Sequence, residues 1–420
     1  MQNYKNERLL IISNNVLSTT RNNGKTVYSY IDSLPKENVA QFYFYNEQPS
    51  IEGYSYYRII DKDIIKGMFS PKKRGNVLCP TTETASASAM PVSPRITTSF
   101  FRILREILWY KKWKSPKLVE WLDSFSPTAV FFVAGDAGFA YDIYKFVCRR
   151  YNPKASLYIT DDYVTPRSKE SFCEKIKRKF IRRKLTEALT ITDTFFTVSR
   201  PMKDKYLEDF GRDSKTIVNF SESLKENVEK IPDDRTVLLY AGSLYYGREQ
   251  VIGKIASAIE KYNNKSPQKK AVLNVYTNVE PDETTKKLFV IDGCGEYCGS
   301  LNKEELKIAL NRADILLFAE SFDEEQIEKT KYSLSTKVTE YLSVGKPILA
   351  VGPQNIGSME HLADVSLCIN DMESLEEKLF TLLDNASMRE ELSEKALEKY
   401  EKCHNREMLQ TQFISDLFKF

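Results

Sequence analysis

The sequence predicts an α/β protein of two domains, each built on a parallel sheet. Three observations predict this class: the length of 420 residues, short apolar runs that alternate with longer amphipathic stretches, and a polar segment between two such series. A chain of this length is too long for one core and fits two domains of ordinary size. Apolar runs that alternate with helical stretches are typical of βαβ units, whose parallel strands are buried on both faces.

The apolar runs predict the strands in order along the chain. In the first half they are expected at Leu9–Ser13, Ala40–Tyr45, Tyr56–Ile60, Ala129–Val133, Ser156–Ile159, Phe195–Val198 and Thr216–Val218. In the second half they are expected at Thr236–Ala241, Val272–Tyr276, Leu288–Ile291, Ile315–Phe318, Ile348–Val351 and Ser366–Ile369. The segment 221–235 between the two series is polar and charged, as in an interdomain linker. We therefore expect two facing Rossmann-like domains, residues 1–220 and 236–400.

Composition excludes several classes of protein. The net charge is only +3, so the overall charge does not indicate nucleic-acid binding. No stretch approaches the ~18 apolar residues that span a membrane, and the first apolar run is too short for a signal peptide. Of the seven cysteines only Cys294 and Cys298 lie close together, and they lack the nearby histidines of a zinc site. We expect a cytoplasmic protein with reduced thiols that is soluble or lies on a membrane surface.

Two polar segments are expected to be loops. Cys79–Thr98 is rich in Ser, Thr, Ala and Pro, which predicts a mobile loop. Ser321–Lys331 is acidic and is expected to form either a flexible flap or an ordinary solvated charge run.

The stretch Lys331–Pro353 is the most informative part of the chain. Hydroxyl side chains precede a short helix that contains Lys337 and Glu340, and Gly345-Lys346-Pro347 then leads into a buried strand. A helix that begins at such a loop presents unpaired N–H groups and a positive dipole end, which suit a phosphate. Glu340, further along the helix, could accept hydrogen bonds from a ribose. The alternative is an ordinary helix–strand unit with a surface glutamate.

This pattern resembles the nucleotide-sugar site of glycosyltransferases with the GT-B fold, especially bacterial enzymes similar to glycosyltransferase family 4. The resemblance is strongest over Arg235–Asp371 and covers nearly the whole chain. It implies that the last helix, residues 402–420, packs back on the first domain. It also implies transfer of a sugar from a nucleoside-diphosphate sugar to a hydroxyl of a glycan or lipid-linked glycan. The expected settings are capsule, O-antigen or exopolysaccharide synthesis, with retained anomeric configuration and without a metal or cofactor.

The resemblance also implies which residues bind the donor. Family 4 enzymes have an Arg directly after the glycine of the first turn and a Lys about five residues later, and here these positions hold Ser243 and Arg248. Arg248 and Lys337 are therefore expected to hold the diphosphate together with backbone amides of the hydroxyl loop. The donor-binding residues predicted in this way are Gly24, Lys25, Gly242, Ser243, Arg248, Gly293, Gly299, Tyr332, Ser333, Leu334, Ser335, Thr336, Lys337 and Glu340.

The sequence departs from the family at one acid. Family members often have two glutamates seven residues apart, but only the second is present, as Glu340, because Tyr332 occupies the first position. Glu320, which follows the strand Ile315–Phe318, is the candidate to supply a catalytic acid from another direction.

The first half resembles the acceptor side of the family. Asn22, Asn23, Gly24 and Lys25 follow the first strand, although the first glycine and the spacing of a P-loop are absent. Asp136 ends a strand where the family often has a histidine, so it is expected to face the reacting hydroxyl. The acceptor-side residues predicted are Asn22, Asn23, Asp161, Asp162, Ser199 and Arg200.

Two basic stretches suggest a membrane surface. Ser99–Lys117 combines aromatic residues with cations, and Lys175–Lys184 is strongly basic, as in helices that bind anionic lipid. The protein is accordingly expected in the cytoplasm, either free or peripheral on the inner face of the plasma membrane. Alternatively, the aromatic residues belong to the core and the cations are merely solvated. Under the membrane hypothesis, replacing Lys177, Arg178, Arg182 and Arg183 with glutamine should reduce binding to anionic vesicles.

Two other functions stay open. One is a sugar-nucleotide epimerase of related GT-B architecture, which needs no acceptor. The other is a non-catalytic binding protein whose donor site has decayed.

Overall fold

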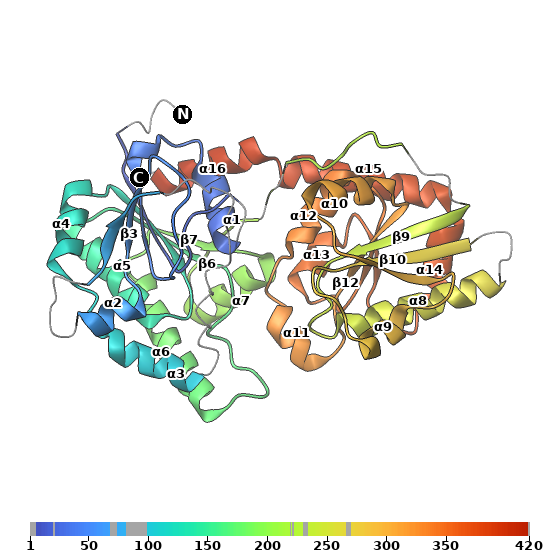
Figure 1. The fold of residues 1–420 in the computed structure, drawn as a ribbon, viewed down its shortest axis with the longest axis horizontal. Helices are drawn as coiled ribbons and strands as arrows, with labels where there is room; N and C mark the ends of the chain where they lie inside the picture. Colours follow the sequence, from blue (N-terminus) through green and yellow to red (C-terminus); the bar gives the residue numbers. More distant parts are fainter. Residues whose placement is uncertain are drawn as a thin grey trace. The chain divides into compact units, whose positions relative to one another are not determined.

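The chain forms two compact units, Met1–Ile217 with Glu407–Phe420, and Val218–Arg406. We call them unit 1 and unit 2. The computed structural model describes residues 6–19, 22–67, 74–80, 99–218, 220, 222–229, 234–265 and 270–418. Each unit is a sheet with helices packed around it (Figure 1).

The sheet of unit 1 has the strand order β4-β3-β2-β1-β5-β6-β7-β8. All neighbouring strands are parallel except β3 and β4. The strands are β1 Leu9–Ser13, β2 Val39–Tyr43, β3 Ser55–Arg58, β4 Asn76–Leu78, β5 Ala129–Ala134, β6 Lys154–Ile159, β7 Thr194–Thr197 and β8 Lys215–Thr216. The central strands β1, β2 and β5 are buried at every position, as expected of parallel strands covered on both faces.

The helices of unit 1 include one from the far end of the chain. They are α1 Asn22–Ile31, α2 Asp61–Lys66, α3 Ser99–Trp109, α4 Pro116–Phe125, α5 Gly138–Tyr151, α6 Phe172–Leu189, α7 Arg200–Phe210 and α16 Arg406–Phe418, with a 3-10 turn at Lys36–Asn38. Phe413 of α16 packs against Tyr30, Phe131 and Phe196, with ring centroids 4.8 to 5.5 Å apart. Figure 1 shows α16 close to α1, and Gln410 donates a hydrogen bond to Asp32. Burial of Phe413 contributes about 2–3 kcal/mol to this attachment.

The sheet of unit 2 is entirely parallel, in the order β11-β10-β9-β12-β13-β14. Its strands are β9 Arg235–Ala241, β10 Lys270–Tyr276, β11 Gly295–Gly299, β12 Ile315–Ala319, β13 Ile348–Val351 and β14 Leu367–Ile369. Its helices are α8 Arg248–Lys265, α9 Glu283–Phe289, α10 Lys303–Arg312, α11 Glu324–Thr330, α12 Thr336–Val344, α13 Gly357–Leu362, α14 Leu375–Asp384 and α15 Ala386–Cys403.

One strand prediction was wrong, and two strands, β4 and β11, were not predicted. The run Leu288–Ile291 is not a strand, because α9 extends to Phe289 and the strand at this edge is β11. Four apolar residues cannot distinguish a helix end from a strand by periodicity. Gly295 begins β11, and a side chain there would meet the Phe289 carbonyl oxygen at 2.0 Å. The short strand β4 was not predicted, and only its partner β3 flanks it.

The polar segments differ from simple loops. Within 222–229, the backbone N–H groups of Leu224 and Glu226 donate to Ser343 and Asn311, so this part of the predicted linker packs on unit 2. The acidic stretch expected to be either a flexible flap or a solvated charge run contains α11, with Asp323 as its N-cap and no buried residue. Most of the loop predicted at 79–98 lies outside the described residues.

Candidate functional site

The carboxyl ends of the parallel strands of unit 2 gather several of the predicted residues. β9, β12 and β13 are neighbours, and their ends are followed by Gly242, Glu320 and Gly352. This edge of an open parallel sheet is where such folds bind ligands. The sheet topology therefore brings together residues that are far apart in sequence.

Arg248 and Glu320 form a buried ion pair at this edge. The guanidinium contacts both carboxylate oxygens at 2.9 to 3.2 Å, and the side chains are 13% and 4% exposed. Burial opposes the charge of Arg248, but the carboxylate outweighs burial and raises the pKa of Arg248. The residue predicted to bind diphosphate is thus held by the residue predicted to be catalytic.

A strained turn places Arg248 at the start of α8. Tyr246 and Gly247 both have positive φ, 64° and 74°. A side chain at Gly247 would meet the Ser321 hydroxyl at 2.6 Å. The loop after β12 comes so close that this position favours glycine. Arg248 then begins the helix beside Glu320.

Lys337 lies on the other side of the same edge. Its ammonium donates a hydrogen bond of 3.2 Å to the Tyr240 hydroxyl and lies 4.6 Å from the centre of that ring. A β-carbon on Gly242 would be 1.8 Å from the Lys337 nitrogen. A larger residue at position 242 would displace the ammonium from its present place.

The surroundings of Lys337 disfavour its charged form. Burial, together with the nearby Arg248 charge, lowers the pKa of Lys337 from 10.5 to about 8, and Glu320 and Glu340 only partly offset this. Two cations and two carboxylates share this site, and burial is the main reason that the charged form of Lys337 is disfavoured. An anionic ligand beside Lys337 would favour its charged form.

The N-terminus of α12 opens onto this region. Ser335 is its N-cap but makes no side-chain capping bond, which leaves amide groups of the first turn for another acceptor. The loop before it is fixed from α13, because the Ser358 hydroxyl accepts from the Ser335 N–H at 2.9 Å and donates to the Ser333 carbonyl. Leu334 is buried and anchors the loop, whereas Thr336 is exposed.

Glu340 and Tyr332 belong to the same region. Glu340 follows Lys337 by three residues on α12, which puts both on one face of the helix. The negative charge of Glu340 opposes the lowering of the Lys337 pKa that burial causes. Tyr332 packs under the ammonium of Lys331 at 4.8 Å. The position where family 4 has an acid is thus an aromatic ring covered by a cation.

Other predicted donor residues have local roles. The Ser243 carbonyl accepts from the Tyr240 hydroxyl at 2.6 Å, and its own hydroxyl accepts from the Tyr245 N–H. Gly293 and Gly299 both have positive φ with open space around them, so the turns that flank β11 account for both glycines.

A groove borders the Arg248 side of the site. Its volume is about 470 Å³, within the range of small-molecule sites. Its lining includes Gly247, Glu249, Lys254, Ser321, Asp323 and Met372.

Unit 1 has a separate polar pocket at the carboxyl edge of its own sheet. It is lined by Ser13, Asn14, Asn15, Leu17, Asn23, Gly24, Val27, Gln41, Val133, Ala134, Gly135, Thr160 and Tyr163. Its volume of about 30 Å³ suits one water molecule or one hydroxyl group. The pocket therefore presents hydroxyl and amide groups rather than charge.

The loop after β1 is shaped by buried polar contacts. Gln41 donates to the Ser13 hydroxyl and the Asn15 carbonyl and accepts from the Leu17 N–H. A side chain at Gly24 would meet the Val16 carbonyl oxygen at 2.0 Å, so packing of α1 requires this glycine.

The structure places the other β1–α1 residues around this pocket. Asn23 donates to the Thr160 hydroxyl, and Lys25 is exposed on α1. Asn22 begins α1, but its side chain lies outside the described part of the chain.

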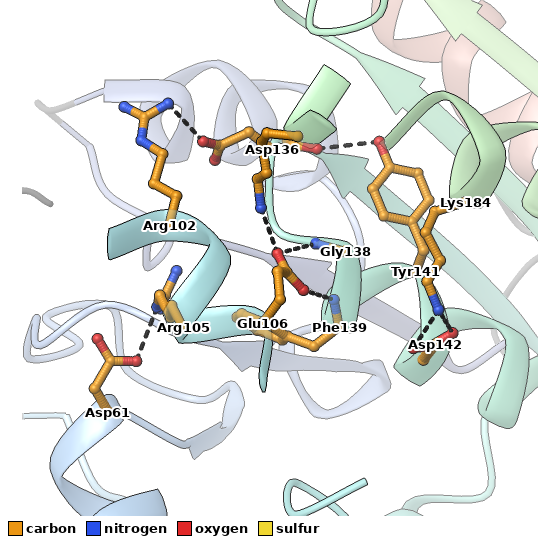
Figure 2. A network of polar contacts seen from close by, with 12 residues as sticks. Asp61, Arg102, Arg105, Glu106, Asp136, Gly138, Phe139, Tyr141, Asp142 and Lys184 are labelled. Carbon is orange, nitrogen blue, oxygen red and sulfur yellow. Dashed lines mark hydrogen bonds and ion pairs between the residues drawn. The ribbon is translucent and has the colours of Figure 1, made fainter. Parts of the chain in front are cut away.

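Asp136 is paired with a cation. Figure 2 shows Arg102 of α3 directed at Asp136, and the two groups are 2.8 Å apart with both side chains partly exposed. Tyr141 donates to the Gly135 carbonyl and steadies the end of β5. A general base at this position would have to leave the guanidinium or work beside it.

The remaining acceptor-side predictions have structural explanations. Asp162 accepts from the N–H groups of Val164 and Thr165 and from the Tyr206 hydroxyl, so it holds a turn. Asp161 accepts from the hydroxyls of Thr160 and Tyr163, which line the pocket.

Ser199 and Arg200 begin α7. Ser199 is buried and caps the helix by accepting from the Met202 N–H, and Met202 is buried in the core. This explains the Ser–x–x–Met pattern without a ligand. The Arg200 side chain is 79% exposed and reaches Asp204 at 3.9 Å.

Three residues of these sites were not predicted. Tyr240 holds Lys337, Ser358 holds the hydroxyl loop, and Gln41 holds the loop after β1. Tyr240 and Gln41 are ordinary strand residues in the sequence, so no local signal marked them.

Neither a metal-binding cluster nor a membrane-spanning helix is present among the described residues. No group of three or more His, Cys, Asp and Glu side chains is placed to hold a metal ion. Within the same residues, no helix has the length and apolar character needed to cross a membrane.

No family model and no curated protein matches the sequence. Solved structures do match over nearly its whole length. The E. coli trehalose-6-phosphate structure bound with UDP-2-fluoro glucose has a TM-score of 0.62 at 12% identity, covering 99% of both chains. Sucrose-phosphate synthase of Thermosynechococcus elongatus has a TM-score of 0.61 at 12% identity, covering 97% of this chain and 98% of that one. HepE of Anabaena in complex with UDP-glucose has a TM-score of 0.57 at 10% identity, covering 98% and 100%.

The chain has the GT-B fold. Two α/β units with parallel sheets, matched over nearly the full length by GT-B glycosyltransferases, establish this class. The similar structures do not single out family 4, so the resemblance holds for GT-B glycosyltransferases as a class.

Proposed function

We propose that the protein is a glycosyltransferase that moves a sugar from a nucleoside-diphosphate sugar to a hydroxyl group. One observation carries the proposal: two partly buried cations, Arg248 and Lys337, lie at the carboxyl edge of the unit 2 sheet near an uncapped helix N-terminus. This constellation suits a diphosphate. The similar structures bound with UDP-glucose or its fluoro analogue support a UDP-sugar as the first donor to test.

The chemistry assigns a role to each group. Departure of the nucleoside diphosphate leaves an oxocarbenium-like sugar, so charge develops on the leaving phosphate oxygens. Lys337, Arg248 and the amides that begin α12 would stabilise that charge in a preorganised site. Glu320 would orient Arg248 rather than act on the sugar, because both of its oxygens already contact the guanidinium. Glu340 would bind the ribose hydroxyls.

The acceptor side is proposed to lie in unit 1. The pocket beside Asn23, Gly135 and Thr160 offers hydroxyl and amide groups, which suit a sugar hydroxyl. Asp136 would take up the acceptor proton once Arg102 shifts from it. We propose a hexose-type donor sugar, retention of anomeric configuration and neutralisation of the diphosphate by the two cations rather than by a metal.

The biological setting is proposed from the resemblance. The acceptor would be a glycan or lipid-linked glycan in capsule, O-antigen or exopolysaccharide synthesis. The protein would work in the cytoplasm at or near the inner membrane surface.

The test is an assay of the purified full chain with a panel of UDP- and GDP-sugars and of sugar and lipid-linked acceptors. Mass spectrometry should detect both the released nucleoside diphosphate and an acceptor heavier by one sugar residue. Arg248→Met and Lys337→Met should abolish both products. Lys287→Met, which removes an exposed lysine from α9, serves as the matched control and should retain them.

Two results would overturn the proposal. A changed donor sugar or free nucleotide without any acceptor product would indicate the epimerase. Absence of nucleotide binding would indicate a decayed site.

A further inference from the structure

Helix α3 presents an apolar face to solvent. Phe100, Phe101, Leu104 and Ile107 lie on one side of it, and Tyr110 follows directly; all five side chains are between 44% and 64% exposed. Residues spaced by three and four positions share a helix face. Single exposed apolar residues are ordinary, but five between residues 100 and 110 form a patch that calls for an explanation.

The opposite face of α3 is firmly anchored. Trp109 is fully buried, stacks on Phe139 and donates to Asp61, and Arg105 pairs with the same carboxylate at 2.8 Å. Glu106 accepts from the N–H groups that begin α5, as Figure 2 shows. The core interpretation of this aromatic stretch is therefore confirmed for the inward face of the helix, and the membrane interpretation stays a prediction for the outward face.

Helix α6 packs beside α3. Its cations fall into an inward set that is ion-paired and an outward set that is exposed. The inward set is ion-paired: Lys177 with Glu106, Arg178 with Glu170, Arg182 with Asp209 and Lys184 with Asp142. Lys177 and Lys184 are buried. Three of the four residues named in the vesicle hypothesis, Lys177, Arg178 and Arg182, thus stabilise the fold. Replacing them would unfold the protein rather than test a surface.

The outward cations of α6 share their helix face with exposed apolar residues. Phe172, Lys175, Ile176, Lys179 and Arg183 are all exposed and recur at the spacing of one helix face. Phe172 is 77% exposed. Lys175 and Lys179 form no ion pair with any described residue, and Arg183 reaches Glu187 only at 3.5 Å.

Charge on these two helices is one-sided. In α3 and the turn after it, through Lys114, the only acid is Glu106, which faces inward. In α6, Glu174 is engaged in the N-terminal capping box and Glu187 pairs with Lys145. Lys111, in the turn after α3, adds an exposed cation that lies 5.2 Å from the centre of the Tyr110 ring. The surface therefore combines protruding apolar side chains with uncompensated positive charge.

We propose that α3 and α6 form a docking face for an anionic lipid membrane. The protruding apolar side chains would enter the boundary between headgroups and acyl chains, and Lys111, Lys175, Lys179 and Arg183 would contact anionic headgroups. A second copy of the chain is a poorer occupant, because a twofold contact would bring the same cations together. The proposal rests on these surface residues and not on sugar transfer.

The test is flotation of the full chain with vesicles, without donor or acceptor. Wild type should float with vesicles of phosphatidylcholine and phosphatidylglycerol and not with phosphatidylcholine alone. Lys175→Gln/Lys179→Gln/Arg183→Gln should weaken partitioning roughly 100-fold, at about five-fold for each cation near an anionic surface. Ile107→Ser/Phe172→Ser should weaken binding through the apolar contribution while leaving the charge unchanged.

A matched variant controls for total charge. Lys225→Gln/Lys287→Gln/Lys303→Gln removes three exposed cations from unit 2 and should bind like wild type. Circular dichroism should show that every variant is folded. Failure of wild type to float with anionic vesicles, or equal losses in the control, would overturn the proposal. So would a dimer in sedimentation velocity that the Ile107→Ser/Phe172→Ser variant abolishes, because a second copy would then cover the face. None of these results bears on nucleotide binding, which is measured separately.

Discussion

Replacing Lys337 with methionine should stabilise the protein and disable its proposed site. Methionine keeps an unbranched side chain of similar length without the ammonium. The ammonium lies against Gly242 and Tyr240, where burial lowers the pKa of Lys337 from 10.5 to about 8. A charge held where its protonated form is disfavoured destabilises the folded state.

The magnitude follows from the pKa. A lowering from 10.5 to about 8, at 1.36 kcal/mol per unit, corresponds to about 3 kcal/mol. The unfolded chain binds the proton more tightly, so the penalty is fully present below pH 8 and disappears as the pH rises to 10.5. Loss of the hydrogen bond to Tyr240 offsets about 1 kcal/mol. Lys337→Met should therefore be about 2 kcal/mol more stable than wild type at pH 7.

Urea denaturation at pH 7 and at pH 10.5 measures this difference. The advantage of the variant at pH 7 should be lost or reversed at pH 10.5, where wild-type Lys337 carries no penalty. Lys287→Met, an exposed control, should match wild type at both values. The same Lys337 variant should bind nucleoside diphosphate roughly 10- to 100-fold more weakly, since a charge-assisted contact is lost. A variant destabilised equally at both pH values would refute the reasoning.

Three further predictions concern single side chains. Glu320→Ala leaves the buried guanidinium of Arg248 unpaired and should cost about 3–5 kcal/mol in urea denaturation, and a loss below about 1 kcal/mol would show the pair to be dispensable. Burial beside His404 lowers the pKa of His361 from 6.5 to about 3, so wild type should lose about 1.4 kcal/mol per unit as the pH falls below 6.5. His361→Leu should lack this dependence, and parallel acid titrations would contradict it. Asp136→Asn should reduce transfer roughly 100-fold or more with little change in stability, and full activity in this variant would exclude it as the base.

Much of the fold was predictable because buried parallel strands leave a direct record in sequence. β1 and β13 were predicted with their observed bounds, since each is an apolar run with a clear end on both sides: Arg8 and Asn14 flank β1, and Pro347 and Gly352 flank β13. The edge strand β11 was not predicted, because Gly295–Gly299 has little apolar content and most of its residues are only partly buried. Such a strand forms through tertiary context.

The sequence predicted which residues belong to the candidate site but not which of them contact one another. The sequence marked Arg248, Lys337 and Glu320, but not that Glu320 would hold Arg248 or that Gly242 would make room for an ammonium. These relations join residues that are 72 and 95 positions apart, which no local pattern records. The basic segment of α6 shows the same limit, because the helix rotation decides which cations are buried in pairs.

The most direct test of the central claim is a thermal and chemical stability panel with UDP, GDP and their sugars, on wild type and Glu340→Ala. A nucleotide at 100 times its dissociation constant should stabilise wild type by about 2.7 kcal/mol, and Glu340→Ala should lose most of that gain because its ribose contact is gone. If neither base stabilises wild type, or if Glu340→Ala responds fully, unit 2 does not bind the donor in the way proposed.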